Sequence, residues 1–210
     1  MGLVDPRLEL YTTGASPTAI NDDWPGSLTA TADSVGAFPF DAGSKDAALS
    51  QSPSGSFTVH AKGTGSGTIL VEVYDTAGGV SPRLINVSTR SQTGTGADVL
   101  IVGFALNGTG TKQVLIRGIG PGLAAFGVAG TVVDPLITVF NAGGSQIATN
   151  DNWDPTLATT FAQVGAFGLP ANSKDAALLV TLPAGTLYTV QLSGVNNATG
   201  EALIEVYEVF

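Results

Sequence analysis

Apolar and polar residues alternate along several short segments of this chain, a pattern typical of half-buried β-strands. Pairs of matching segments show it at 3–11 and 132–140, at 57–61 and 188–192, and at 69–74 and 203–207. Three further strands are expected at 83–90, 98–106 and 112–117, and the turn Asn-Gly-Thr-Gly at 107–110 predicts a hairpin between the last two. No 12-residue window shows a helical period of 3.6, so no long helix is expected, and residues 123–126 suggest a single helical turn.

The same sequence pattern occurs twice. The motif Asn-Asp-x-Trp begins at residues 21 and 150, Val-Gly-Ala-Phe at 35 and 164, and Ser-Lys-Asp-Ala-Ala-Leu at 44 and 173. In all three motifs the second copy lies 129 residues after the first. The offset reaches 133 at Tyr74 and Tyr207, because turns of the second copy are longer. Length changes confined to turns are what a β-fold tolerates, so the chain contains an internal repeat of a β-structure.

The repeat divides the chain into three parts. Residues 1–80 form an incomplete first repeat, 81–131 occur once, and 132–210 are the second copy, which together with the middle part makes a complete unit at 81–210. We expect an all-β chain, an antiparallel β-sandwich of jelly-roll type with two related modules. An incomplete β-unit leaves an open sheet edge. Either the first copy folds alone, or the middle part covers both copies, or a neighbouring chain completes it.

The composition of the chain excludes several classes of partner and of functional site. A net charge of −9 and a pI near 4.2 argue against nucleic acid, because few side chains neutralise phosphates. The absence of cysteine excludes disulfides, thiolate metal sites and a cysteine nucleophile. No apolar run of 18 or more residues exists, so no membrane insertion is expected. The first residues lack the basic and apolar regions of a secretory signal, so an export signal would lie outside this chain.

Several motifs resemble a known family. Asp134-Pro-x-Ile, Asn150-Asp-Asn-Trp153 and the strand pair starting at Leu182-Pro-Ala-Gly-Thr resemble the bacterial pre-peptidase C-terminal type of β-sandwich. The unit 81–210 is also similar to tandem repeats of large secreted or cell-surface bacterial proteins, through the motifs at 83–90 and 114–121. The resemblance implies an extracellular or cell-surface module that binds or displays. Some family members bind Ca²⁺, and some contact polymers such as collagen or glycans, so a polysaccharide or a protein polymer is the expected partner.

The Asn-Asp-x-Trp motifs are the candidate metal sites, because Ca²⁺ takes six to eight oxygen ligands, mainly carboxylates and carbonyls. The candidate oxygen ligands are Asn21, Asp22, Asp23, Asn150, Asp151 and Asp154. The same residues also suit a metal-free turn in which Asn and Asp bond their own backbone, and the sequence favours that interpretation. No EF-hand or nonapeptide calcium repeat is present. No cofactor other than Ca²⁺ is expected.

Carboxylates on the predicted strands supply the alternative hypothesis of a small hydrolase, a glycosidase or an esterase. Glu72 and Glu205 occupy matching strand positions where one carboxylate of a glycosidase pair is conceivable. Asp46 and Asp175 follow matching lysines and would act as an acid or ligand, or else anchor a turn or pair with an arginine such as Arg117. Because no partner carboxylate is placed by the sequence, a non-catalytic role is favoured.

The remaining candidates are weaker. His60 is the only histidine, and no G-x-S-x-G elbow accompanies it, so a serine triad is not supported. The Gly-rich segment 118–122 contains a proline and lacks the Lys-Ser/Thr of a phosphate loop. Trp24 and Trp153 would stack on sugar rings if exposed, although an aromatic at the end of a sandwich is more often buried. The leading hypothesis is a non-catalytic binding or structural module. The small hydrolase is the second hypothesis, and self-association by strand completion is the third.

Overall fold

The computed structural model describes residues 2–77 and 83–210. The chain divides into two compact units, unit 1 (Met1–Arg83) and unit 2 (Leu84–Phe210). The expected boundary between residues 80 and 81 lies outside the described residues. Strands hold 41% of the chain in three antiparallel sheets and helices 16%, which confirms the predicted all-β sandwich.

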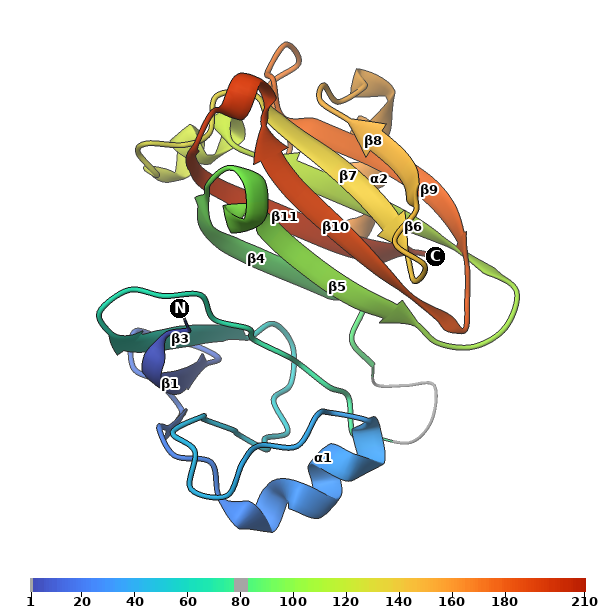
Figure 1. Ribbon diagram of the computed structural model, residues 1–210. Coiled ribbons are helices and arrows are strands. Elements are labelled where there is room, and N and C mark those ends of the chain that lie inside the picture. Colours follow the sequence, from blue (N-terminus) through green and yellow to red (C-terminus); the bar gives the residue numbers. More distant parts are fainter. Residues whose placement is uncertain (1, 78–82) are drawn as a thin grey trace. The chain divides into compact units, whose positions relative to one another are not determined.

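Unit 2 is a sandwich of two four-stranded antiparallel sheets, drawn as layers in Figure 1. One sheet has the order β5-β10-β7-β8 and the other the order β4-β11-β6-β9. The strands are β4 (Asn86–Thr93), β5 (Leu100–Leu106), β6 (Thr111–Ile119), β7 (Pro135–Asn141), β8 (Gln146–Asn150), β9 (Ala176–Pro183), β10 (Thr186–Gly194) and β11 (Gly200–Val209). The strands of residues 84–131 therefore interleave with those of the repeated half.

Strand β6 separates two hydrophobic clusters, because successive side chains of a strand point to opposite faces. Val114 and Ile116 face the other sheet and join the main core, which both sheets share. Leu115 and Ile119 face the opposite way, into a second cluster with Trp153 and Phe161. That outer face is thus covered by the helix α2 (Ala158–Val164) and the loop before it.

Short helices fill the connections of unit 2. A 3₁₀ helix at Pro121–Phe126 confirms the single helical turn expected near residue 123. Another at Pro155–Leu157 leads into α2, which ends at Gly165 in the left-handed conformation with φ 74°. A glycine is suited to that position because it has no Cβ to clash.

Unit 1 contains a smaller version of the same half. Its sheet has the order β2-β1-β3, formed by β1 (Val4–Tyr11), β2 (Ala19–Asn21) and β3 (Thr58–Thr64). A 3₁₀ turn at Gly26–Leu28 precedes the helix α1 (Thr29–Val35). These elements follow the order of β7, β8, the Pro155 turn, α2 and β10 in unit 2.

The registers of the matching strands are the same. Leu10 pairs with Ala19 in unit 1, as Val139 pairs with Ala148 in unit 2. On its other side Leu10 pairs with Val59, as Val139 pairs with Val190. The repeat seen in the sequence is therefore also a repeat of backbone pairing.

Two strand-level predictions are wrong. Residues 69–74 form no strand in unit 1, although their unit 2 counterpart lies in β11. The turn at 107–110 is not a hairpin, because β5 and β6 belong to different sheets and the chain crosses the sandwich there. The physical reason is the same in both cases, since pairing partners rather than local pattern select the strands.

Within 2–77 and 83–210, the structure contains no helix that is long and apolar enough to cross a membrane.

Candidate functional site

The two Asn-Asp-x-Trp loops are held by the same hydrogen bonds. Asn150 Nδ2 donates to the carbonyl oxygen of Asn152 at 2.9 Å, and its Oδ1 accepts from the amide of Ala177 at 2.9 Å. Asn21 makes the two equivalent bonds in unit 1, at 2.8 and 2.9 Å. Each asparagine thus ties its loop to the segment that follows Ser-Lys-Asp, which is the Asx-type role that the sequence favoured over a metal.

The carboxylates of these loops are exposed, and two of them have protein partners. Asp22 and Asp151 face solvent. Asp23 accepts two hydrogen bonds from Lys45 Nζ, at 2.9 and 3.1 Å. Asp154 caps the turn after Trp153, and the amide and hydroxyl of Thr156 that bond it lower the pKa of its carboxyl. Among the residues that the structure describes, no cluster of three or more His, Cys, Asp or Glu is arranged to hold a metal ion.

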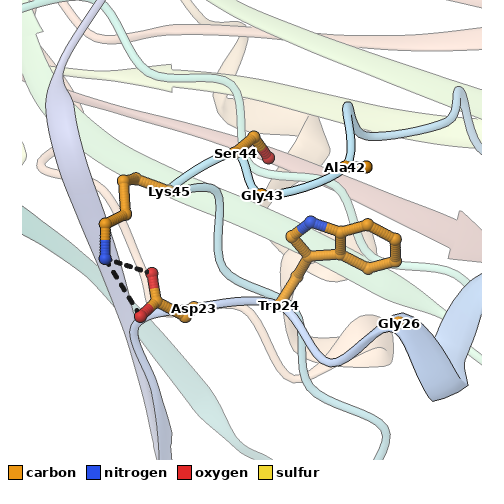
Figure 2. Close-up of a pocket in the computed structure, with 7 residues that line it drawn as sticks. All are labelled: Asp23, Trp24, Gly26, Ala42, Gly43, Ser44 and Lys45. Carbon is orange, nitrogen blue, oxygen red and sulfur yellow. Dashed lines mark hydrogen bonds and ion pairs between the residues drawn. The ribbon is translucent and has the colours of Figure 1, made fainter.

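The two tryptophans have different surroundings. Trp153 is 7% exposed, lies 5.3 Å from the ring of Phe161 and donates from Nε1 to the carbonyl oxygen of Pro170. Trp24 is half-buried and packs edge to face against Phe40 at 5.7 Å, and Ala32 stands at the sequence position that Phe161 has in unit 2. Its indole lines a hollow of about 460 Å³ together with Gly43 and the ion-paired Asp23 and Lys45, as Figure 2 shows. Trp24 therefore offers an aromatic face that Trp153 does not.

Asp175 anchors a turn. Its side chain is fully buried and accepts from the amides of Gly120 and Gly122, at 2.8 and 3.1 Å. Those amides belong to the Gly-rich segment that resembled a phosphate loop, and they bind this internal carboxylate. Asp46, the unit 1 counterpart, is half-buried. The neighbouring Lys174 is exposed and lies 3.8 Å from Asp134.

Glu205 forms a buried ion pair with Arg117. The two residues face each other on paired strands, with Arg117 Nε 3.1 Å from Glu205 Oε2. Burial raises the pKa of Glu205, while Arg117 and a hydrogen bond from the Tyr207 hydroxyl, 2.9 Å from Oε1, act in the opposite direction. Burial also lowers the pKa of Arg117 and raises that of Tyr207.

Aromatic rings complete the surroundings of Arg117. Its guanidinium lies 4.5 Å from the ring centre of Phe161 and 4.4 Å from that of Phe167. Its Nη1 also donates to the carbonyl oxygen of Phe167 at 2.7 Å. A cation between two rings and beside a carboxylate ties β6 to β11 and to the α2 region. Glu205 is thus one member of a buried ion pair that links these elements.

Glu72 has a different environment from its counterpart Glu205. It is exposed, and its companion Tyr74 is 39% exposed. The pKa of Tyr74 is raised by partial burial and by the charge and hydrogen bond of Glu72, so the Glu-Tyr pair of unit 2 recurs here. The structure therefore places Glu72 and Glu205 in matching positions of two separate units.

A polar cluster on β1 and β3 was not predicted from the sequence. Glu9 is 3% exposed and is bonded by Arg7, by the Tyr11 hydroxyl at 2.6 Å and by Lys62 Nζ at 2.6 Å. The hydrogen bond from Lys62 is the main reason that the pKa of Glu9 falls to about 2. The alternation Arg-x-Glu-x-Tyr on one strand face was the available signal. The ring of His60 lies 4.6 Å from that of Tyr11 beside this cluster, with the two ring planes tilted by 42°.

No protein-family model and no curated protein matches this chain, so the resemblance to pre-peptidase C-terminal domains stays a prediction.

Proposed function

We propose that this chain is a non-catalytic structural repeat module of an exported bacterial protein, related to the pre-peptidase C-terminal type of β-sandwich that it resembles. In this role the strands form a rigid antiparallel scaffold, and the polar loops face the surroundings at the cell surface. The expected partners are neutral polymers, a polysaccharide or a protein, rather than nucleic acid, because the chain carries a net charge of −9.

The observation that carries the proposal is the set of bonds made by the repeated residues. Asn21 and Asn150 make the same two bonds, and the amides of Trp24 and Trp153 donate to equivalent carbonyl oxygens at 2.7 and 2.8 Å. Every one of these bonds is internal to a unit. Structural bonding thus accounts for the motif shared by the two halves without a ligand.

The loops supply the test of this proposal. The melting temperature of the chain is expected to be the same in calcium and in EGTA, because the side-chain oxygens of Asn21, Asn150 and Asp154 already accept hydrogen bonds from backbone amides of the protein. Replacement Asn150→Ala is expected to destabilise unit 2 by about 1–3 kcal/mol through the unpaired amide of Ala177. A calcium-dependent rise in melting temperature that Asp151→Asn removes would assign the loop to metal binding instead, with Asp22→Asn as the matched variant in unit 1.

The hollow at Trp24 favours carbohydrate binding as a second candidate function. A half-buried indole beside an ion pair provides a stacking face and polar groups, which is the combination that sugar rings use. Soluble oligosaccharides titrated onto the chain are expected to shift the Trp24 indole N–H resonance and to leave that of the buried Trp153 unchanged. Trp24→Ala is expected to abolish retention on an insoluble glycan, and equal retention of the parent and variant would exclude this site.

A further inference from the structure

We propose that unit 1 is an acceptor for an additional β-segment of the type formed by residues 84–131, which would complete it as β4, β5 and β6 complete unit 2. The inference rests on the proposed function, in which both halves are copies of one structural repeat. It goes further, because it assigns to unit 1 a specific surface and a specific kind of partner.

Unit 2 shows what such a segment does. Strand β6 lies between β9 and β11, β4 pairs with the other edge of β11, and β5 pairs with β10. All three strands come from residues 84–131. Without residues 84–131, strand β11 would lack both of its partners, β4 and β6, and β9 would lose β6, its neighbour in the sheet. The sandwich is therefore a joint product of the two parts.

Unit 1 keeps the point at which that segment enters the repeated half. In unit 2 the amide of Val132 donates to the carbonyl oxygen of Glu201 at 3.0 Å, just where residues 84–131 end. In unit 1 the amide of Leu3 donates to the carbonyl oxygen of Thr68 at 2.9 Å. Parallel bridges at Gly2 and at Thr131 accompany the two bonds. The entry geometry is thus the same in both units.

Unit 1 also keeps the apolar residues that unit 2 buries against the segment. Val71 and Val73 are 43% and 47% exposed, whereas their counterparts Ile204 and Val206 in β11 are 0% and 5% exposed. Residues 47–54 and 69–74 correspond to β9 and to part of β11, and neither forms a strand. An exposed apolar stripe with strand pattern and no strand partner among the described residues is a surface suited to β-strand addition.

The polar contacts of the segment have counterparts as well. In unit 2, Arg117 is held by Glu205 and Phe167, and the Gly-rich turn by Asp175. The equivalent residues of unit 1 are Glu72, Phe38 and Asp46. Glu72 is exposed, Phe38 is 52% exposed and Asp46 is half-buried. Glu72 and Phe38 are thus available to bind an arginine, and Asp46 is available to accept from the two amides of a Gly-x-Gly turn.

These contacts define the occupant. It is a polypeptide segment with three strands like β4–β6, an arginine at the position of Arg117 and glycines at those of Gly120 and Gly122. A second copy of this chain is the poorer choice, because its own β4–β6 are already paired with β9, β10 and β11. Each chain has two repeated halves but one segment of the type 84–131. If copies of the chain exchanged these segments, half of the repeated halves would still lack one.

The experiment adds the segment to the intact chain. A further copy of residues 84–131 is placed directly before Leu3, so that its Thr131 takes the position of Gly2. Hydrogen exchange of the amides at 47–54 and 69–74 is expected to slow by roughly a hundredfold or more relative to the 210-residue chain, approaching β9 and β11. Unchanged exchange at both segments would overturn the proposal.

A disulfide test checks the register and does not depend on stability. Leu115 pairs with Leu179 in unit 2, and Ser50 is the counterpart of Leu179. Because the chain has no cysteine, Leu115→Cys in the added copy combined with Ser50→Cys is expected to cross-link on mild oxidation. The matched control, Val114→Cys in the added copy with Ser50→Cys, points the thiol to the other face and is expected to stay reduced.

The outcomes separate the possibilities. Equal cross-linking in the two registers would contradict the proposal. In the 210-residue chain, an intermolecular Leu115→Cys to Ser50→Cys bond in a dimer would assign the occupant to a second copy and overturn our choice. The proposed function is tested separately, by calcium-dependent melting and by turnover of the 210-residue chain. Neither measurement involves the added segment.

Discussion

At the scale of single residues, buried charge in this protein is organised in compact groups with structural partners. Arg117 and Glu205 pair inside the outer cluster of unit 2, and Glu9 gathers Arg7 and Lys62 on the sheet of unit 1. The sequence indicated Glu205 as a candidate acid but did not indicate its burial, because a strand glutamate is usually exposed. Burial was decided by the helix and loop that cover that face.

The Arg117–Glu205 pair makes a prediction about stability. Glu205→Gln is expected to destabilise unit 2 by about 3 kcal/mol, because the guanidinium is left buried without its countercharge. Glu72→Gln in unit 1 is expected to change stability by less than about 0.5 kcal/mol, since that side chain is exposed. The effect of Glu205→Gln is measured by urea unfolding followed by Trp153 fluorescence in a Trp24→Phe chain. The effect of Glu72→Gln is measured in the same way by Trp24 fluorescence in a Trp153→Phe chain.

The hydrolase hypothesis is tested by the same two variants. Loss of turnover on a glycan or ester in Glu205→Gln without loss of stability would support catalysis. Unchanged turnover in both variants would remove the two glutamates from any catalytic scheme.

Glu9 makes a prediction about pH. Its pKa falls from 4.5 to about 2 in the folded protein, so its stabilisation is complete above the unfolded value and is lost as the pH falls from 4.5 towards 2. Unit 1 is therefore expected to lose urea resistance as the pH falls from about 4.5 to about 2, measured by Trp24 fluorescence in a Trp153→Phe chain. In Glu9→Gln this part of the pH dependence should disappear, and an identical pH profile would contradict the assignment.

At the scale of elements, strand formation follows the available partner. Residues 69–74 and 203–207 have nearly the same alternating pattern, but only the second becomes a strand, because β4 and β6 pair on either side of it. The same rule explains the crossing between β5 and β6, where the sequence predicted a hairpin. The helical turn near residue 123 and the Asx turns at Asn21 and Asn150 were predictable, since the bonds that form them join near neighbours. The bonds that tie these two loops to Ala48 and Ala177 span 27 residues and depend on the fold.

Close contact of β6 with the opposite sheet gives an element-scale prediction. A Cβ at Gly118 would lie 2.3 Å from Ile137 Cγ2 and 3.1 Å from Leu192 Cδ1, so Gly118→Ala is expected to destabilise unit 2 by about 1–3 kcal/mol. The strand glycine Gly103 is the matched control, because its nearest such neighbour, the Tyr188 carbonyl oxygen, is at 3.9 Å. The urea midpoint of unit 2 in a Trp24→Phe chain reports both, and equal midpoints would contradict the close packing.

At the scale of the whole molecule, the two units differ in how much hydrophobic surface they bury. Unit 2 has two clusters of buried side chains, whereas Leu10 is the one buried hydrophobic side chain among the described residues of unit 1. Since burial of apolar surface is the main favourable term in folding, the units are unequal in stability.

Unfolding is therefore expected in two steps, unit 1 first. In the Trp153→Phe chain the Trp24 signal should change at a lower urea concentration than the Trp153 signal does in the Trp24→Phe chain. Coincident transitions from both probes would mean that the units unfold together. A chain carrying the added copy of residues 84–131 should move the Trp24 transition upward.

The sequence by itself determined the all-β character, the repeat and its offset of 129 residues, and the loops around the two tryptophans. These features depend on alternation, on the repeat of the sequence itself and on the turns that Asn21 and Asn150 form with near neighbours, which a single strand or turn already specifies. Only the tertiary structure decided that residues 84–131 interleave with the second copy, that Glu205 is buried against Arg117, and that 69–74 forms no strand. The reason is physical: a β-strand exists only when another strand satisfies its backbone, and that partner lies far away in the sequence.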